Sequence, residues 1–224
     1  MDDGKARHIR GKFSSEWAEI LERRVTLECS DEETVYLTRP NDAMKIQRII
    51  SKHVDRVEVV VDAFACIGGD SLAIMCVHPS ADLYAIQRVK SDVERDRFSR
   101  LGSNIRKVRN ILRRPGRVNW VDSDVGNFLM KFDQSISVLY LDPPWAVGSD
   151  PSKISPLSEI RRFLENNVFN HLRKDAYPRA ICFKLPFKAR DIEKWPGLTV
   201  PYVSVGYKFM RESYHIHVVH IAES

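Results

Sequence analysis

The sequence lacks the features of a membrane-embedded or secreted protein. No uninterrupted apolar run approaches the roughly 18 residues that a membrane-spanning helix needs. The first residues, Met1–Lys5, hold no apolar core of a signal peptide. We therefore expect an intracellular protein, in the cytoplasm or the nucleus.

Patterns for a metal site or a disulfide framework are also missing. The four cysteines include no Cys-x-x-Cys pair, which argues against zinc and against structural disulfides. Three histidines recur near the C-terminus at alternating or near positions of one strand, without an acidic or thiol partner. We expect no metal. The residues concerned are Cys29, Cys66, Cys76, Cys182, His215, His217 and His220.

The glycine motifs of dinucleotide and nucleoside-triphosphate sites are absent too. There is no Gly-x-Gly-x-x-Gly and no Gly-Lys-Ser/Thr. Instead, the apolar stretch Val59–Val61 ends at Asp62, and the pair Gly68–Gly69 leads into the apolar run Leu72–Met75. This order predicts a strand, a tight turn and a helix, the arrangement in which an α/β sheet binds a nucleotide-like ligand. The alternative interpretation is a turn with a purely structural role and no ligand.

Length and composition fit one domain with a modest extension. A chain of 224 residues with 43% apolar content can bury a full core. We expect residues 1–34 to form an N-terminal helical extension and residues 35–224 to form the domain. Trp17, Ile20 and Leu21 lie at helical spacing in the extension, which is too short for a core of its own.

Strands alternate with helices along most of the chain. Apolar runs predict five strands, and two further strands predict a C-terminal antiparallel hairpin. Amphipathic stretches predict a helix capped by Asn41 or Asp42, another capped by Asp92, and a third over 158–173. The alternation predicts an α/β fold with a doubly wound, mostly parallel seven-stranded sheet. The strands are expected at 59–61, 82–86, 118–121, 137–141, 180–186, 199–206 and 208–222.

The net charge of +5, with a pI near 9.0, suits a polyanionic partner. Much of the excess lies in one segment that could either track phosphates or form a solvated helix surface. Its basic residues are Arg88, Lys90, Arg95, Arg97, Arg100, Arg106, Lys107, Arg109, Arg113, Arg114 and Arg117.

The stretch Asp142-Pro143-Pro144-Trp145 follows another apolar strand. It resembles the signature of S-adenosylmethionine-dependent methyltransferases that act on an amino group of a planar ring. Such an amine is a poor nucleophile, and it improves when acceptors take its N–H bonds. The Asp142 carboxylate and a carbonyl of the rigid Pro143–Pro144 turn are such acceptors. Trp145 would stack on the ring.

The chain resembles the trimethylguanosine synthase family from about Val35 to the C-terminus. The similar segments are Leu37–Pro40, Val60–Ser71, Asp142–Trp145 and Phe183–Pro186. Members of this family methylate the N2 amine of a 7-methylguanosine RNA cap. The resemblance implies a Rossmann-like methyltransferase fold, S-adenosylmethionine as cofactor and capped RNA as partner, with a possible protein partner in a capping or RNA-processing complex.

The resemblance also implies roles for single residues. Thr38 would contact the methionine end of the cofactor, Asp62 and the glycine turn would hold it, and Asp124 would meet the adenine amine. Trp145 would stack on the methylated guanine. The implied cofactor-binding residues are Thr38, Asp62, Phe64, Gly68, Gly69, Gln87 and Asp124.

The chain departs from the family pattern at three places. Asp142 stands where the family has serine, and Ala146–Val147 stand where it has two glycines. Gln87 occupies the turn after the second strand, where an acidic residue would accept both ribose hydroxyls. A glutamine side chain can accept only through its carbonyl oxygen.

Other functions remain open from the same residues. Lys45, Asp142, Lys184 and Glu212 follow the order of the tetrad in ribose 2′-O-methyltransferases, in which Lys184 would deprotonate a hydroxyl. In the cap-methylating alternative Lys45 and Lys184 would instead contact substrate, and loss of Lys184 would be mild. N6-adenine methylation and a non-enzymatic RNA-binding subunit are the further alternatives.

Overall fold

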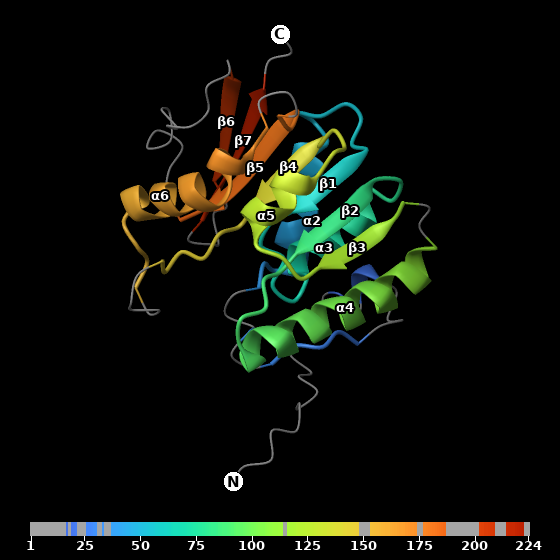
Figure 1. Ribbon diagram of the computed structural model, residues 1–224. Helices are drawn as coiled ribbons and strands as arrows, with labels where there is room; N and C mark the ends of the chain where they lie inside the picture. Colours follow the sequence, from blue (N-terminus) through green and yellow to red (C-terminus); the bar gives the residue numbers. More distant parts are fainter. Residues whose placement is uncertain are drawn as a thin grey trace.

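The structure is a computed structural model of the chain (Figure 1). It describes residues 17, 19–21, 26–30, 33, 37–113, 116–147, 153–173, 177–186, 202–208 and 214–221. Within these ranges no helix is both long enough and apolar enough to cross a membrane.

In the described part of the chain, seven strands form one sheet in the order β3-β2-β1-β4-β5-β7-β6. Strands β1 to β5 run parallel, whereas β7 pairs antiparallel with both β5 and β6. The fold class expected from the sequence is therefore confirmed. The strands are β1 (Val59–Asp62), β2 (Asp82–Ile86), β3 (Val118–Val121), β4 (Val138–Leu141), β5 (Ala180–Leu185), β6 (Tyr202–Lys208) and β7 (His215–Ile221).

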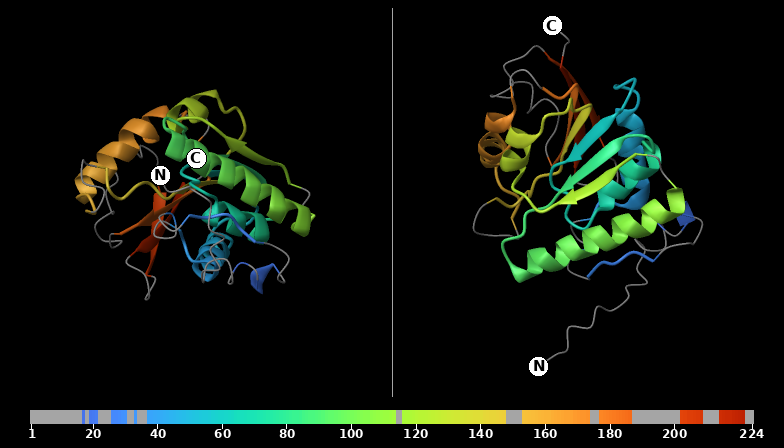
Figure 2. Two further views of the ribbon diagram at one scale, coloured as in Figure 1. Left: turned by 90° about the horizontal axis from the view of Figure 1, so that it is seen from below. Right: turned by 45° about the vertical axis from the view of Figure 1, so that its right-hand side comes forward.

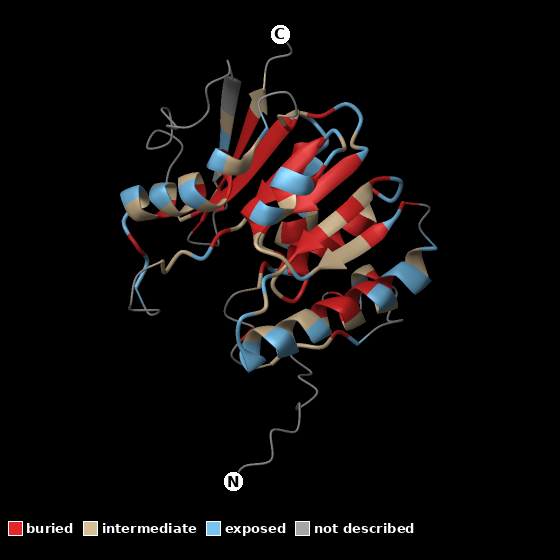
Figure 3. Cartoon of the chain, in the orientation of Figure 1, coloured by how far each residue is buried: buried red, intermediate tan, exposed pale blue. Residues whose placement is uncertain are grey.

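Helices cover both faces of the sheet (Figures 1 and 2). Because side chains of a strand alternate between faces, Val60 packs with the core on one side while Val59 and Val61 pack with the other. The first core includes residues of α2 (Pro40–Ile50), α3 (Gly69–Val77) and α4 (Asp92–Leu112). The second includes residues of α5 (Val125–Lys131), α6 (Leu157–Asn167) and the 3₁₀ helix η2 (Phe169–His171). The central strands are buried on both faces (Figure 3).

Two predicted helix caps are wrong by one to three residues. Helix α2 begins at Pro40, whose fixed φ suits the first helical position, so Asn41 and Asp42 already lie inside the helix. Helix α4 is capped by Ser91 rather than Asp92, because the Ser91 hydroxyl accepts a hydrogen bond from the Glu94 backbone.

Two element ends also differ from the prediction. The helix expected over 158–173 ends at Asn167 and continues only as the separate turn η2. The C-terminal pair is present, but β6 extends to Lys208 and β7 starts at His215.

The described N-terminal residues pack on the first core. Trp17, Leu21 and Leu27 are buried among the side chains of α2, α3 and α4. Glu33, itself buried, pairs with Arg100 at 2.9 Å, and Glu28 pairs with Lys107 at 2.7 Å. These contacts tie the segment to α4. The division at residue 34 stays a prediction, because most of residues 1–34 lie outside the described ranges.

Burial of Trp17 predicts a large stability effect. Trp17→Ala should lower the free energy of unfolding by roughly 3–5 kcal/mol, because a large side chain with no exposed surface leaves a cavity. The exposed neighbour Glu19 supplies the control, and Glu19→Ala should change stability by less than about 0.5 kcal/mol. Urea unfolding measures both. Equal, small effects would show that the N-terminal segment is not part of the core.

Candidate active site

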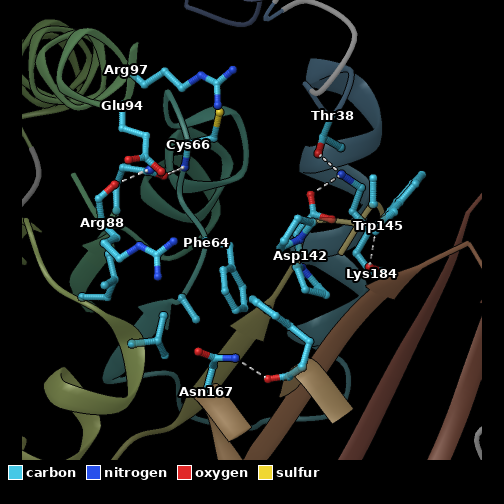
Figure 4. Close-up of a pocket in the computed structure, with 18 of the residues that line it drawn as sticks. Thr38, Phe64, Cys66, Arg88, Glu94, Arg97, Asp142, Trp145, Asn167 and Lys184 are labelled. Carbon is cyan, nitrogen blue, oxygen red and sulfur yellow. Dashed lines mark hydrogen bonds and ion pairs between the residues drawn. The ribbon is translucent and has the colours of Figure 1, made fainter. Parts of the chain in front are cut away.

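A cavity of about 790 Å³ opens at the carboxyl ends of the parallel strands (Figure 4). Its lining comes from the segments that follow β1, β2, β3 and β4, such as Phe64, Gln87, Asp124 and Asp142. Ligands of open α/β sheets bind at this edge, outside the carboxyl ends of the strands. The volume suits a nucleotide-sized molecule.

Three buried or nearly buried carboxylates gather beside one end of this cavity, and of the three only Asp142 lines it. Asp62 is the last residue of β1 and its Oδ2 accepts a hydrogen bond from Ser71 at 2.5 Å. Asp70, in the first turn of α3, accepts from the Thr38 hydroxyl at 2.6 Å. Its other oxygen, Oδ1, is buried without a hydrogen-bond partner among the described residues. The third carboxylate is that of Asp142.

Lys184 of β5 lies beside Asp142 and Thr38 (Figure 4). Its ammonium nitrogen donates to Asp142 Oδ2 and to Thr38 Oγ1, both at 2.6 Å, and lies 3.8 Å from Asp70 Oδ2. The same nitrogen lies 5.1 Å from the ring centroid of Tyr214 and 5.8 Å from that of Trp145. With 4% of its surface exposed, Lys184 is enclosed by acids, a hydroxyl and two aromatic rings.

Burial and mutual repulsion shift the pKa values of this group. Burial, reinforced by Asp70, raises the pKa of Asp62 to about 7. Burial raises the pKa of Asp142 to about 6, although Lys184 opposes the shift. For Lys184, burial alone would lower the pKa, but the neighbouring Asp142 and Asp70 outweigh it and the pKa is raised. Lys184 is therefore an ammonium at neutral pH.

The other end of the cavity differs from what the family resemblance implies. The Gln87 carbonyl oxygen accepts from the Cys66 backbone at 3.1 Å, and its amide donates to the Arg88 carbonyl at 2.9 Å. Gln87 thus lines the cavity while both ends of its amide are bonded to the backbone around the turn after β1. Asp124 caps α5 through the Gly126 backbone at 3.1 Å and lies 3.6 Å from Arg88.

Two residues in the turn after β1, Cys66 and Gly68, have a positive φ. Gly68 has a φ of 97° and precedes α3, and an added Cβ would lie 2.9 Å from Leu101. Gly69 has no such positive φ. Cys66 adopts a left-handed φ of 50° in the same turn, which an L side chain rarely does.

The structure brings most of the predicted site residues together. Asp62, Gly68 and Gly69 lie behind the cavity rather than in its lining, and Lys45 is exposed on α2 away from the lining. Glu212 lies outside the described residues. The predicted residues that line the cavity are Thr38, Phe64, Gln87, Asp124, Asp142, Pro143, Pro144, Trp145 and Lys184.

Several lining residues were not predicted from the sequence. Arg88, Glu94 and Arg97 line the end near Gln87 (Figure 4), and Tyr214 lines the end near Lys184. The sequence does contain a pattern that could have pointed to Glu94, because Glu94 lies three residues after Ser91, as in a capping box at a helix start. No sequence pattern pointed to Tyr214 as a lining residue, because an aromatic residue beside a strand is usually a core residue.

Several solved structures with a similar fold are methyltransferases. The MTase domain of METTL16 matches with a TM-score of 0.63 at 12% identity, over 93% of this chain and 92% of that chain. The rRNA methyltransferase AviRa from Streptomyces viridochromogenes matches with a TM-score of 0.60 at 13% identity, over 96% of each chain. A SAM-dependent O-methyltransferase from Thermotoga maritima matches with a TM-score of 0.52 at 14% identity, over 92% and 71%.

These likenesses establish the fold: the chain has the Rossmann-like fold of S-adenosylmethionine-dependent methyltransferases. At identities this low they do not establish a substrate. No protein-family model and no curated protein sequence matches the chain.

The raised pKa of Asp62 makes stability depend on pH. Since its folded pKa is about 7 against an ordinary 3.8, the fold keeps a proton that the unfolded chain releases between those values. The free energy of unfolding should therefore fall as pH rises from 4 to 7, by about 1.4 kcal/mol for each unit of pKa difference.

Urea unfolding of the ligand-free protein from pH 4 to 8 measures this fall. In Asp62→Asn the free energy of unfolding should fall less over this pH range, because the contribution of the Asp62 carboxyl is gone. Asp55→Asn, at an exposed carboxyl, should unfold like the unchanged protein at every pH. An undiminished fall in Asp62→Asn would assign the pH dependence to other groups.

Proposed function

We propose that the protein is an S-adenosylmethionine-dependent RNA methyltransferase, and specifically that it methylates the N2 amine of a 7-methylguanosine cap. One observation carries this proposal. The Asp142–Trp145 turn lines the same cavity as the segments that follow β1, β2 and β3, on the fold of methyltransferases. A methyl donor and an amine acceptor could therefore meet in one enclosed space.

The residues present fit this cofactor. Asp62, Asp70 and Asp142 carry more negative charge than Lys184 can balance, and Asp70 Oδ1 has no partner among the described residues. S-adenosylmethionine carries a positive sulfonium and an ammonium group, so its charge complements this end of the cavity. When bound, the cofactor supplies an electrophilic methyl group. Phe64 and Asp124 line the remaining wall.

The groups around Asp142 suit an amine rather than a hydroxyl. A carboxylate and the carbonyls of a rigid proline turn accept N–H bonds, which makes the lone pair of an acceptor amine more available for methyl transfer. The half-buried Trp145 is held by its indole nitrogen, which donates to the Lys184 carbonyl at 3.4 Å, so one flat ring borders the cavity. A planar base could stack on that ring.

The structure offers less support for ribose 2′-O-methylation. In that reaction Lys184 would have to take a proton from the ribose hydroxyl, yet its pKa is raised by Asp142 and Asp70. Lys45, the first member of the tetrad, does not line the cavity. Adenine N6 is also an amine on a planar ring, so the same acceptors would serve it. Product analysis distinguishes it from guanine N2.

Exposed basic residues on and near α4 support an RNA partner. Lys90, Arg95, Arg106, Arg109 and Arg113 are exposed there. Some of the predicted phosphate-tracking residues also form ion pairs: Arg97 and Arg100 with Glu33, Lys107 with Glu28, Arg117 with Asp82 and Arg95 with Asp92. Arg114 lies outside the described residues. RNA as substrate implies an intracellular location, and a protein partner in a capping or RNA-processing complex remains a proposal.

Product analysis tests the reaction. The protein is incubated with labelled S-adenosylmethionine and with capped, uncapped or internally unmodified RNA, and the nucleosides are identified by mass spectrometry. We expect label in N2-methylated 7-methylguanosine. Label in 2′-O-methyl nucleosides or in N6-methyladenosine would show that the protein methylates that position instead of the cap guanine.

Trp145→Ala should weaken substrate binding by about 1–3 kcal/mol through lost stacking.

Cofactor binding separates an enzyme from an RNA-binding subunit. Titration calorimetry should show binding of S-adenosylmethionine to the unchanged protein. Absence of binding, together with RNA binding, would identify a non-enzymatic methyltransferase-like subunit.

The α4 surface gives a separate prediction about RNA affinity. The logarithm of affinity for single-stranded RNA should fall linearly with the logarithm of salt concentration, by about 0.7 for each phosphate neutralised. The double variant Arg95→Ala/Arg109→Ala should flatten this slope. The control pair Lys131→Ala/Arg162→Ala, exposed on the opposite face of the sheet, should not. Equal slopes in both variants would show that RNA does not follow α4.

A further inference from the structure

We propose that Lys184 is a positioning residue: it holds the Asp142 carboxylate by one oxygen, so that the other oxygen faces the methyl acceptor. This proposal rests on the proposed function, because it concerns how Asp142 serves an acceptor amine. It differs from both sequence-based roles of Lys184, which were proton abstraction from a hydroxyl and contact with the substrate.

Lys184 borders the cavity, but groups of the protein itself surround its ammonium nitrogen. Its nitrogen is bound to Asp142 and Thr38, each at 2.6 Å. The faces of Tyr214 and Trp145 lie around the same nitrogen. Two of its three protons are donated to oxygen atoms, and Asp70 at 3.8 Å faces it as well. An ammonium held by these partners is suited to orient them rather than to bind a substrate.

The same geometry defines what Asp142 can offer. Asp142 follows the last residue of β4 and lines the cavity, and its side chain is 17% exposed. Lys184 binds Oδ2, and the Trp145 side chain also donates toward the Asp142 carboxylate. An N–H bond from a substrate would therefore go to the remaining lone pairs, chiefly those of Oδ1. A carboxylate that could rotate freely would present either oxygen at varying angles, and misplacement by about 1 Å costs roughly a hundredfold in rate.

Lys184 also couples Asp142 to the region that faces the cofactor. Thr38 Oγ1 accepts from Lys184 and donates to Asp70, which makes a continuous chain from Asp142 to the first turn of α3. A cation bound beside Asp70 would therefore act on the same network as Lys184. The ionisable groups around Lys184 are Asp62, Asp70, Tyr140, Asp142, Cys182 and Tyr214.

A double-mutant cycle tests the proposal. Lys184→Gln keeps a donor but removes the charge, and Asp142→Asn removes the partner. If Lys184 acts through Asp142, Lys184→Gln should lower kcat roughly 10–100-fold with little change in KM for either substrate. In the Asp142→Asn background the same change should have less than about a threefold effect. The exposed Lys52→Gln serves as the control for a lysine change.

The pH profile separates positioning from proton abstraction. With the cation gone, the acidic limb of the kcat profile should move to higher pH in Lys184→Gln, because Asp142 becomes harder to ionise. Lys184→Arg, which keeps the charge, should keep the limb in place. Additive effects in the cycle, or activity of Lys184→Gln lost at every pH while Asp142→Asn stays active, would overturn the proposal.

Thermal unfolding tests the pairing without any activity. Lys184→Gln should lower Tm in the unchanged background, more at pH 8 than at pH 5, and far less in the Asp142→Asn background. An equal drop in both backgrounds would overturn the proposal even if no RNA is methylated. Failure of the unchanged protein to methylate any RNA would overturn the proposed function instead.

Discussion

The balance between one buried ammonium and the carboxylates around it is the constraint on which the site depends. Lys184 of β5 binds Asp142 after β4, and through Thr38 it reaches Asp70 on α3. Burying carboxylates is costly unless they are paired or protonated. The network therefore joins the ends of two central strands, a helix and the segment before α2, and it forms one wall of the cavity.

The same charge arrangement would make a cationic ligand electrostatically favourable in this site. Asp62 and Asp142 have raised pKa values of about 7 and about 6, which reflects burial with too few cations nearby. A ligand that brings positive charge would lower the cost of ionising them. Such coupling means that occupancy of the cavity and the protonation of Asp62 and Asp142 depend on each other.

The basic residues around α4 serve two purposes that charge counting cannot separate. Arg100 and Lys107 hold the N-terminal segment through Glu33 and Glu28, and this segment leads to Thr38 at the cavity. Exposed residues such as Arg95 and Arg109 remain available to a polyanion. The same helix thus supports one wall of the cavity and presents positive charge beside it.

At the cavity end near Gln87, the turn after β2 lacks the acidic residue that the family resemblance implies. Gln87 bonds to the backbone of Cys66 and Arg88, so it stabilises the turn after β1. Glu94 lies nearby in the lining, fixed by the Lys90 backbone at 2.6 Å. An acidic side chain is therefore present at this end of the cavity, supplied by α4 rather than by the strand.

The sequence by itself determined the layers of the fold. Apolar periodicity and turn residues predicted β1 to β5 and the C-terminal antiparallel pair, because these patterns are local and report which face of an element is buried. Local chemistry likewise placed Asp62 and the Asp142–Trp145 turn at strand ends. The helix caps and some element ends were wrong, since Pro40 sets the start of α2 and Ser91 takes the cap of α4 from its neighbour Asp92.

Tertiary structure alone decided the partners within the site. Thr38 and Lys184 are 146 positions apart, and nothing local in either segment indicates that they bind each other. The exposure of Lys45, the enclosure of Lys184 and the lining role of Tyr214 follow from how the elements pack. Periodicity tells which side of a strand is buried, but the partner on that side depends on packing across the whole sheet.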